Sequence, residues 1–439
     1  MKRLLFFLSM LLFPAGCVLP QGNIVPDGAL QLVQPETVGM SGERLGRIDE
    51  MFQKYISDRW INGASAIILK NGKIVYYKGT GYNDIEKKTP LNKDVLFRIA
   101  SQTKAVTSVA VMMLYEQGKF LLDDPVSKYL PEFKNQKVLD KFNSADSSYT
   151  TIEPKRPVSI RDLLSHTSGL GYPAIGTKEM NALYAKYNII MGITDKKIYL
   201  KDEMEKLAKV PIGFQPGEKW CYGLSVDVLG RLVEAVSGMS LDDYFKRNIF
   251  EPLGMHNTFF YLPEGKYDQF AKLYSRDNDN NLIMLTKSKD FDPDYPIVNG
   301  TYFSGGGGLV STAYDYALFL QMLLNGGELN GKRLLSESTI RMMRTNQIGE
   351  LRSGSLFLPS GGDEFGLGFE IISKQGSIQI PMPAGSYGWG GTFGSLYWID
   401  PVNNIAVQLV LQVSPNSYNE IRSKFVSLVY QAVTDTHVK

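Results

Sequence analysis

Strand-like sequence lies at both ends of this chain, and helix-like sequence fills the middle. Near the N-terminus, apolar runs at 64–69 and 74–77 flank Asn71-Gly72, the dipeptide that favours a two-residue β-hairpin turn. Similar runs return at 365–372, 377–380, 394–399 and 405–413. We therefore expect an α+β fold. Both chain ends would build one antiparallel sheet flanked by helices, with an inserted, mainly helical region at about residues 105–310.

Helical spacing of apolar residues supports this division. It appears near the N-terminus at Leu45, Ile48, Phe52 and Tyr55, and again at 105–115, 225–236 and 313–324. Ser240-x-x-Asp243 and Ser417-x-x-Glu420 have the spacing of capping boxes, so we expect a helix to begin after each serine. A short strand at 96–99 leads directly to Ser101.

Composition excludes several classes of function. The 439 residues include 47 Lys and Arg against 45 Asp and Glu, so the chain has no basic excess that would favour nucleic acid as a partner. Only two cysteines, Cys17 and Cys221, and three histidines are present. We therefore expect no structural disulfide in the mature chain and no metal site or other cofactor.

The first 40 residues predict export. Lys2 and Arg3 precede an apolar stretch, 4–13, that is too short to span a bilayer, so residues 1–16 are interpreted as a signal peptide. The small residues before Cys17 resemble a bacterial lipobox, although Pro14 departs from that pattern. Residues 17–40 are rich in Pro, Gly and polar residues and are interpreted as a tether. We expect an exported protein, periplasmic or lipid-anchored through Cys17 to the bacterial outer membrane, with no other membrane contact.

Ser101-Gln-Thr-Lys104 is the strongest candidate for chemistry. Positions i and i+3 share one face of a helix, so the Ser101 hydroxyl and the Lys104 amine can meet. Unpaired N–H groups of the first helical turn point toward the same place. This is the arrangement of a serine nucleophile with a lysine as proton acceptor. The alternative is a helix cap beside a solvated lysine.

Three further strings could complete such a site. Tyr222 precedes a helix, and its hydroxyl could shuttle protons, although it could equally be a core aromatic. In Trp389-Gly390-Gly391-Thr392, paired glycines beside a strand would let a ligand approach the backbone, unless they form a bulge or a turn. The string at 163–169, LLSHTSG, is interpreted as a supporting wall. The glycines at 305–308 lack the lysine of a P-loop, which argues against phosphate binding.

The strings follow one another in the order S-x-x-K, LLSHTSGL, Y-x-x before a helix, and W-G-G. This order resembles that of the serine β-lactamase-like superfamily, especially class C β-lactamases and family VIII carboxylesterases. The resemblance covers about residues 40–435 and implies a β-lactamase/transpeptidase-like domain at 41–435. It implies that Ser101 is the nucleophile, Lys104 its activating base and Tyr222 the acid/base for the leaving group and then for water. The N–H groups of Ser101 and Thr392 would form the oxyanion hole, with Trp389, Gly390 and Gly391 in the place of the family's K-T-G or H-x-G strand motif.

Two departures from the penicillin-recognising pattern favour ester hydrolysis. Leu224 stands where Y-x-N has an amide that grips a β-lactam or a peptide, and Trp389 stands where a lysine or histidine would hold a carboxylate. Both match family VIII esterases. We therefore expect a serine hydrolase acting on a small-molecule ester. A β-lactamase, DD-peptidase or D-aminopeptidase acting on an amide is the alternative. If the chain were a non-catalytic binding protein, we would expect the motif residues to be lost. If it were an α/β-hydrolase, we would expect a G-x-S-x-G string, which this chain lacks.

Overall fold

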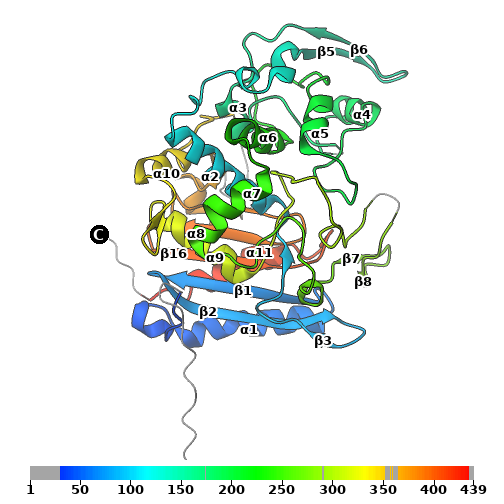
Figure 1. The fold of residues 1–439 in the computed structure, drawn as a ribbon. Helices are drawn as coiled ribbons and strands as arrows, with labels where there is room; N and C mark the ends of the chain where they lie inside the picture. The colour runs from blue at the N-terminus through cyan, green and yellow to red at the C-terminus, as the bar shows by residue number, and fades with distance from the viewer. Residues whose placement is uncertain are drawn as a thin grey trace, which may run out of the picture.

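An eight-stranded antiparallel sheet forms the base of the molecule in this computed structural model, which describes residues 30–173, 175–288, 291–351, 356, 358 and 364–434 (Figure 1). The strand order is β12-β13-β14-β15-β16-β1-β2-β3. The strands are β1 Gly63–Lys70, β2 Lys73–Asp84, β3 Thr89–Pro90, β12 Glu364–Phe365, β13 Glu370–Ile371, β14 Tyr387–Gly390, β15 Leu396–Asp400 and β16 Ile405–Val410.

The two ends of the chain meet at the pairing of β1 with β16. Their antiparallel register runs from Ser65 opposite Val410 to Lys70 opposite Ile405. The predicted hairpin joins β1 to β2, and both of its turn residues, Asn71 (φ 52°) and Gly72 (φ 73°), are left-handed, as a type I′ turn requires. The expectation of one antiparallel sheet made from both chain ends is therefore confirmed.

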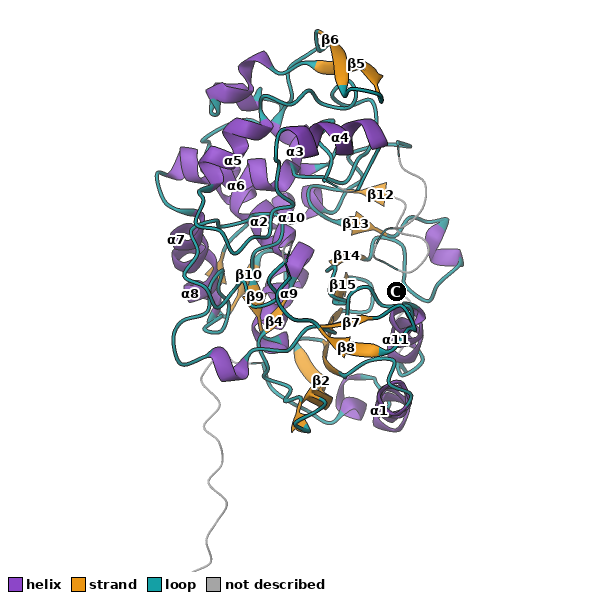
Figure 2. Cartoon of the chain, turned by 90° about the vertical axis from the view of Figure 1, so that its right-hand side faces the viewer, coloured by secondary structure: helices purple, strands orange, loops and turns teal. Residues whose placement is uncertain are grey.

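Helices cover both faces of this sheet. Figure 2 shows α1 (Gly42–Ser57) and α11 (Glu420–Tyr430) side by side on one side and α9 (Ala313–Leu324) on the other. Side chains alternate along β1, so Ile68 packs in the cluster with α1 and α11, whereas Ile67 and Leu69 pack in the larger cluster with α2 (Thr103–Glu116) and α9. Burying both faces explains the almost continuously apolar sequence of β1.

A mainly helical region lies on the α9 side of the sheet, at the top of Figure 1. Its α6 ends at Gly238, whose φ of 72° suits the left-handed cap, and Ser159 forms a reciprocal capping box with Asp162 in α3. The helices that fill this region or flank it are α3 Ile160–Leu164, α4 Lys178–Lys186, α5 Leu200–Leu207, α6 Ser225–Ser237, α7 Leu241–Phe245, η5 Lys246–Phe250 (a π-helix), α8 Glu251–Leu253 and α10 Glu337–Met343.

Short strand pairs and 3₁₀ turns connect these elements. β4 (Phe97–Arg98) pairs with β9 (Val310–Ser311), β5 (Val138–Asn143) with β6 (Ser148–Ile152), β7 (Tyr274–Arg276) with β8 (Leu282–Met284), and β10 (Glu328–Leu329) with β11 (Lys332–Arg333). The 3₁₀ turns are η1 Pro35–Val38, η2 Ala100–Gln102, η3 Val126–Lys128, η4 Pro131–Asn135, η6 Tyr267–Gln269 and η7 Gly376–Ile378. The inserted region therefore contains two β-hairpins as well as helices.

Three local predictions in the last quarter are wrong. The run 365–372 is split into β12 and β13, because Gly368 turns the chain with a φ of 96°. The predicted strand at 377–380 is largely replaced by η7, where the Ser373 hydroxyl accepts the N–H of Gly376 and stabilises a turn. Ser417 does not cap α11, which begins after Asn419, because its hydroxyl donates to Asn280 Oδ1 at 3.0 Å.

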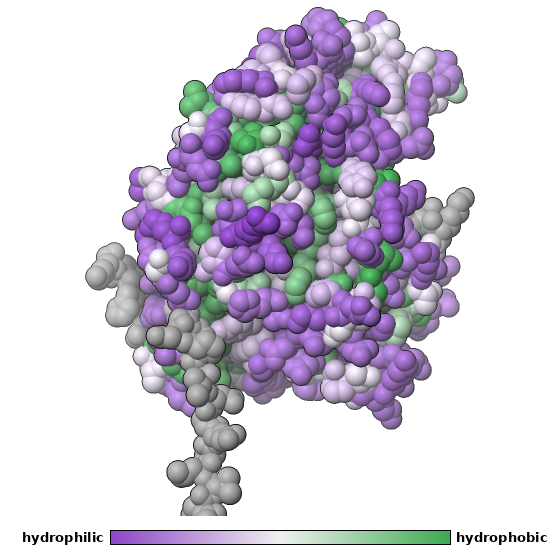
Figure 3. All heavy atoms as spheres, in the orientation of Figure 1, coloured by the Kyte–Doolittle hydropathy of each residue, from purple (hydrophilic) through white to green (hydrophobic). Residues whose placement is uncertain are grey.

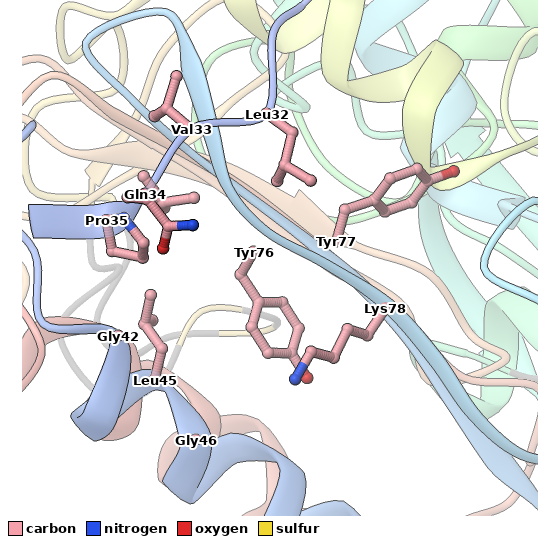
Figure 4. Close-up of a pocket in the computed structure, with 11 residues that line it drawn as sticks. Leu32, Val33, Gln34, Pro35, Gly42, Leu45, Gly46, Tyr76, Tyr77 and Lys78 are labelled. Carbon is pink, nitrogen blue, oxygen red and sulfur yellow. The ribbon is translucent and has the colours of Figure 1, made fainter. Parts of the chain in front are cut away.

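The N-terminal segment from Leu30 onward packs against the sheet edge. The N–H of Val33 donates to the carbonyl of Ile74 in β2 at 3.0 Å, and Leu30 is buried. A pocket of about 560 Å³ lies between this segment, α1 and β2, lined by residues such as Leu32, Pro35 and Tyr76 (Figure 4). Residues 30–40 of the segment interpreted as a tether therefore belong to the packed chain.

The signal segment 1–16 and Cys17 lie outside the described residues. Among the residues that the structure does describe, no helix is both long enough and apolar enough to cross a bilayer. The face drawn in Figure 3 is mostly hydrophilic, with hydrophobic residues showing between the hydrophilic ones.

Candidate active site

A sharp turn presents Ser101 at the start of α2. The chain leaves β4, which is held by pairing with β9, and enters the 3₁₀ turn η2 with Ala100 in the left-handed region at φ 46°. The carbonyl of Gln102 accepts a hydrogen bond from the Tyr316 hydroxyl of α9 at 2.9 Å. Ser101 is therefore a turn residue two positions before the first residue of α2 rather than its cap, which is Gln102, and the turn is fixed from both sides.

The three predicted catalytic side chains meet at one hydroxyl. The Lys104 amine donates to Ser101 Oγ at 3.3 Å, and the Tyr222 hydroxyl donates to the same Oγ at 2.6 Å. Lys104 is only 2 % exposed, so the alternative of a solvated lysine beside a helix cap is wrong. Lys104 Nζ also lies 4.7 Å from the centre of the Tyr222 ring, where the cation and the aromatic face attract each other.

Two partners of the lysine were not predicted from the sequence. Lys104 Nζ donates to the Tyr172 hydroxyl at 3.0 Å and to the carbonyl of Gly306 at 2.6 Å, so the amine contacts three oxygens with Ser101 Oγ. Burial, with the nearby Tyr222 and Asp227, raises the pKa of Tyr172 well above its usual range, so this phenol stays neutral.

One of these partners follows a string singled out in the sequence, and the other lies within such a string. Tyr172 comes three residues after the LLSHTSG string, and Gly306 belongs to the glycine run considered as an anion cradle. Within this run, the carbonyl of Gly306 instead accepts a hydrogen bond from the Lys104 amine. Its neighbour Gly305 accepts a hydrogen bond from Thr107 of α2 at 2.7 Å, which holds the run against that helix.

Aromatic rings surround the Tyr222 side chain. Ring centres of His166 and Trp389 lie 5.2 and 5.4 Å from that of Tyr222, and Phe365 packs against Trp389 at 5.5 Å. His166 adopts a left-handed φ of 59°, and its carbonyl accepts the N–H of Cys221 at 2.8 Å. The 163–169 string thus supports the site, as predicted, by fixing the backbone next to Tyr222.

Leu224 and Trp389 are almost completely buried. Leu224 lies at the N-cap position of α6 and donates its N–H to Gly171 at 3.2 Å, while Trp389 packs beneath the Tyr222 ring. Trp389 therefore adds an apolar ring to the surroundings of Tyr222. Their direct contact with a substrate stays a prediction.

The glycines after Trp389 allow a close approach of the protein's own backbone. A Cβ on Gly391 would lie 2.6 Å from the carbonyl oxygen of Ile99 and 2.3 Å from Ser395 Oγ. The end of β14, which includes Gly390, can therefore press against the turn that carries Ser101. The sequence predicted that these glycines let a ligand approach the backbone. Thr392 follows at the exposed start of the turn to β15, and its oxyanion role stays a prediction.

Comparisons with known proteins agree with this geometry. Residues 48–431 match the family described as Beta-lactamase. The chain is similar to Esterase EstB of Burkholderia gladioli (31% identity, 83% of this chain and 89% of that protein). It is also similar to Lovastatin esterase of Penicillium rubens (29% identity, 88% and 98%). A solved structure of EstCE1, described as a hydrolase with promiscuous acyltransferase activity, superposes with a TM-score of 0.75 at 28% identity, covering 88% of this chain and 99% of that one.

The fold expectation and the resemblance are both confirmed, since the match spans most of the chain and the antiparallel sheet with its helices agrees with the structural neighbours. The chain is therefore a serine hydrolase that belongs to the Beta-lactamase family.

Proposed function

We propose that this protein hydrolyses small-molecule carboxylic esters through an acyl-enzyme on Ser101. The observation that carries the proposal is the sharing of Ser101 Oγ between the Lys104 amine at 3.3 Å and the Tyr222 hydroxyl at 2.6 Å. One group can accept the serine proton while the other gives a proton to the leaving group, which is the pairing that acyl transfer requires.

In acylation, Ser101 Oγ attacks the ester carbonyl carbon as Lys104, in its neutral form, takes the hydroxyl proton. Backbone N–H groups of Ser101 and Thr392 would stabilise the tetrahedral oxyanion, a contribution of about 3 kcal/mol for each donor. When the C–O bond to the alcohol breaks, Tyr222 gives its proton to the leaving oxygen. The serine proton held by Lys104 then restores Tyr222, so the net transfer runs from Ser101 to the released alcohol.

Deacylation reverses these roles with water as the attacking group. Tyr222 and Lys104 together take one proton from water, whose oxygen attacks the acyl carbon. Ser101 Oγ then leaves and regains that proton. The overall reaction consumes one ester and one water and releases one alcohol and one carboxylic acid, with no redox change.

The surroundings of Tyr222 favour esters over β-lactams. Leu224 offers no amide, and the buried Trp389 offers no cation for a substrate carboxylate. Two relatives of the chain are named as esterases. An alkoxide is also a better leaving group than an amide nitrogen, so cleavage of an ester depends less on protonation of the leaving atom.

The test compares purified wild type, Ser101→Ala and Ser108→Ala on p-nitrophenyl acetate and butyrate, nitrocefin and a D-alanyl-D-alanine peptide. Ser108 is a matched control, since it is a buried serine of α2, the helix that follows Ser101, and its hydroxyl has no hydrogen-bond partner among the described residues. We expect ester turnover that falls by about 10³-fold or more in Ser101→Ala and is retained in Ser108→Ala. Unchanged turnover in Ser101→Ala, or nitrocefin hydrolysis far faster than ester hydrolysis, would contradict the proposal.

We also propose that the protein is exported and lipidated at Cys17, and that it is periplasmic or held at the bacterial outer membrane by that anchor. Support comes from Lys2 and Arg3, the short apolar stretch and the small residues before Cys17. Mass spectrometry of the mature N-terminus should find a lipid-modified Cys17 as the first residue, and Cys17→Ser should lack the modification. An unmodified N-terminus beyond residue 17 would refute the anchor.

A further inference from the structure

A buried carboxylate lies behind the candidate active site, and the proposed chemistry does not use it. Asp227, in the first turn of α6, is fully buried. Its Oδ1 accepts hydrogen bonds from Ser304 Oγ at 2.7 Å and from the N–H of Gly306 at 3.4 Å, and the Tyr302 hydroxyl faces the same carboxylate. Such a group is costly to bury unless a charge compensates it.

Gly306 joins this carboxylate to the lysine. Its N–H points to Asp227 Oδ1, and its carbonyl accepts the Lys104 amine at 2.6 Å. A Cβ on Gly306 would lie only 2.4 Å from Asp227 Oδ2 and 3.1 Å from the Tyr172 hydroxyl, which itself contacts Lys104. The carboxylate, the phenol and the amine therefore converge around one glycine that has no room for a side chain.

Lys104 is the basic side chain that faces Asp227 in this cluster. The other groups facing the carboxylate are uncharged, namely the hydroxyls of Ser304, Tyr172 and Tyr302. Beyond Tyr302 lies the buried carboxylate of Glu203, which is paired with Lys206. Burial raises the pKa of Asp227, and Lys104 in its protonated form opposes that rise, so the ammonium group stabilises the ionised carboxylate.

We propose that Asp227 is a positioning residue whose negative charge stabilises Lys104 in the protonated form created when Ser101 is acylated. The inference rests on the proposed function only in taking Ser101 as nucleophile and Lys104 as base. In that step the Ser101 O–H bond breaks and an N–H bond forms on Lys104, so a positive charge appears beside the buried carboxylate. Without the carboxylate, the amine is a weaker base and gives up its proton at lower pH.

The test measures how fast a fluorophosphonate probe labels Ser101 in the full-length protein as a function of pH. This probe reports nucleophile activation without requiring the right ester. Asp227→Asn keeps an acceptor for Ser304 and Gly306 but removes the charge. We expect the acidic limb of its labelling profile to move about one pH unit or more to lower pH, with a plateau rate reduced about tenfold. A reduced rate with an unmoved limb would show a merely structural role and overturn the inference.

Two companion variants sharpen the result. Thr107→Val removes a hydrogen bond to Gly305 in the same loop without changing any charge, so its limb should stay in place even if its rate falls. Ser304→Ala removes a donor that stabilises the ionised carboxylate, so its limb should move in the same direction as that of Asp227→Asn, by less. If Asp227→Asn does not fold, an unmoved limb in Ser304→Ala overturns the inference. Failure of wild type to label at Ser101 would instead contradict the proposed function.

Discussion

The Tyr222 side chain meets two separate requirements of the site. Its hydroxyl donates to Ser101 Oγ at 2.6 Å, while its ring packs against His166 and Trp389. In the proposed mechanism, the ring contacts position the hydroxyl and the hydroxyl moves the proton. Because the two contributions come from different atoms, one substitution can separate them.

Tyr222→Phe should reduce kcat for ester hydrolysis by about 10²–10⁴-fold, the usual contribution of a positioned acid or base. The melting temperature should change little, since the ring contacts remain. Steady-state kinetics and thermal unfolding measure the two effects, and Tyr82→Phe serves as a control because Tyr82 is exposed. An unchanged kcat would remove the hydroxyl from the mechanism.

Among the elements, α9 links the sheet to the turn that carries Ser101. Thr312 caps its first turn by accepting the N–H of Asp315, and Tyr316 holds the carbonyl of Gln102. Asp315 in turn accepts the N–H of Asn257 at 2.6 Å and the hydroxyl of Thr258 at 3.1 Å, which fixes the loop after α8. Burial nevertheless outweighs these hydrogen bonds and raises the pKa of Asp315 to about 6.

This raised pKa gives α9 a pH-dependent stability. An unfolded aspartate has a pKa of about 3.9, so the folded state binds the Asp315 proton more tightly. The resulting stabilisation is fully present below about pH 4 and is lost as the pH rises through about 6. In urea unfolding, the free energy of unfolding of wild type should therefore fall by about 3 kcal/mol relative to that of Asp315→Asn as the pH rises across this range. A constant difference between the two proteins across this range would contradict the assignment.

At the scale of the whole molecule, the two chain ends are packed together. Phe52 of α1 and Phe425 of α11 stack at 5.9 Å between ring centres, in the cluster on the face of the sheet away from α2. Folding of the sheet therefore requires both ends of the chain, which enclose the helical region between them.

Phe425→Ala should lower the free energy of unfolding by about 3–5 kcal/mol, because it removes a fully buried ring and leaves a cavity. The value of kcat per folded molecule should be retained, since the ring packs on the opposite face of the sheet from α2. Denaturant titration with active-site counting by the fluorophosphonate probe measures both quantities. Ser423→Ala, at an exposed position of the same helix, should leave both unchanged.

Local patterns explain which features were predictable. The i, i+3 spacing of Ser101 and Lys104 dictates their contact because helix geometry brings such side chains together, and Asn71-Gly72 dictates its hairpin through the φ angles of two residues. Alternation and helical spacing were sufficient to divide sheet from helices. They failed at 377–380, where side-chain hydrogen bonds to the backbone formed a turn, and at β14, whose four residues include two glycines.

The sequence by itself therefore determined the sheet from both chain ends, the contact between Ser101 and Lys104, and the family. Only the tertiary structure decided what surrounds the lysine. Tyr172 and Gly306 lie 68 and 202 residues from Lys104 along the chain, and Asp227 reaches it through Gly306. No local pattern specifies such contacts, because they form only when separate elements pack into one buried cluster. In such a cluster the exclusion of water strengthens each charge interaction and hydrogen bond.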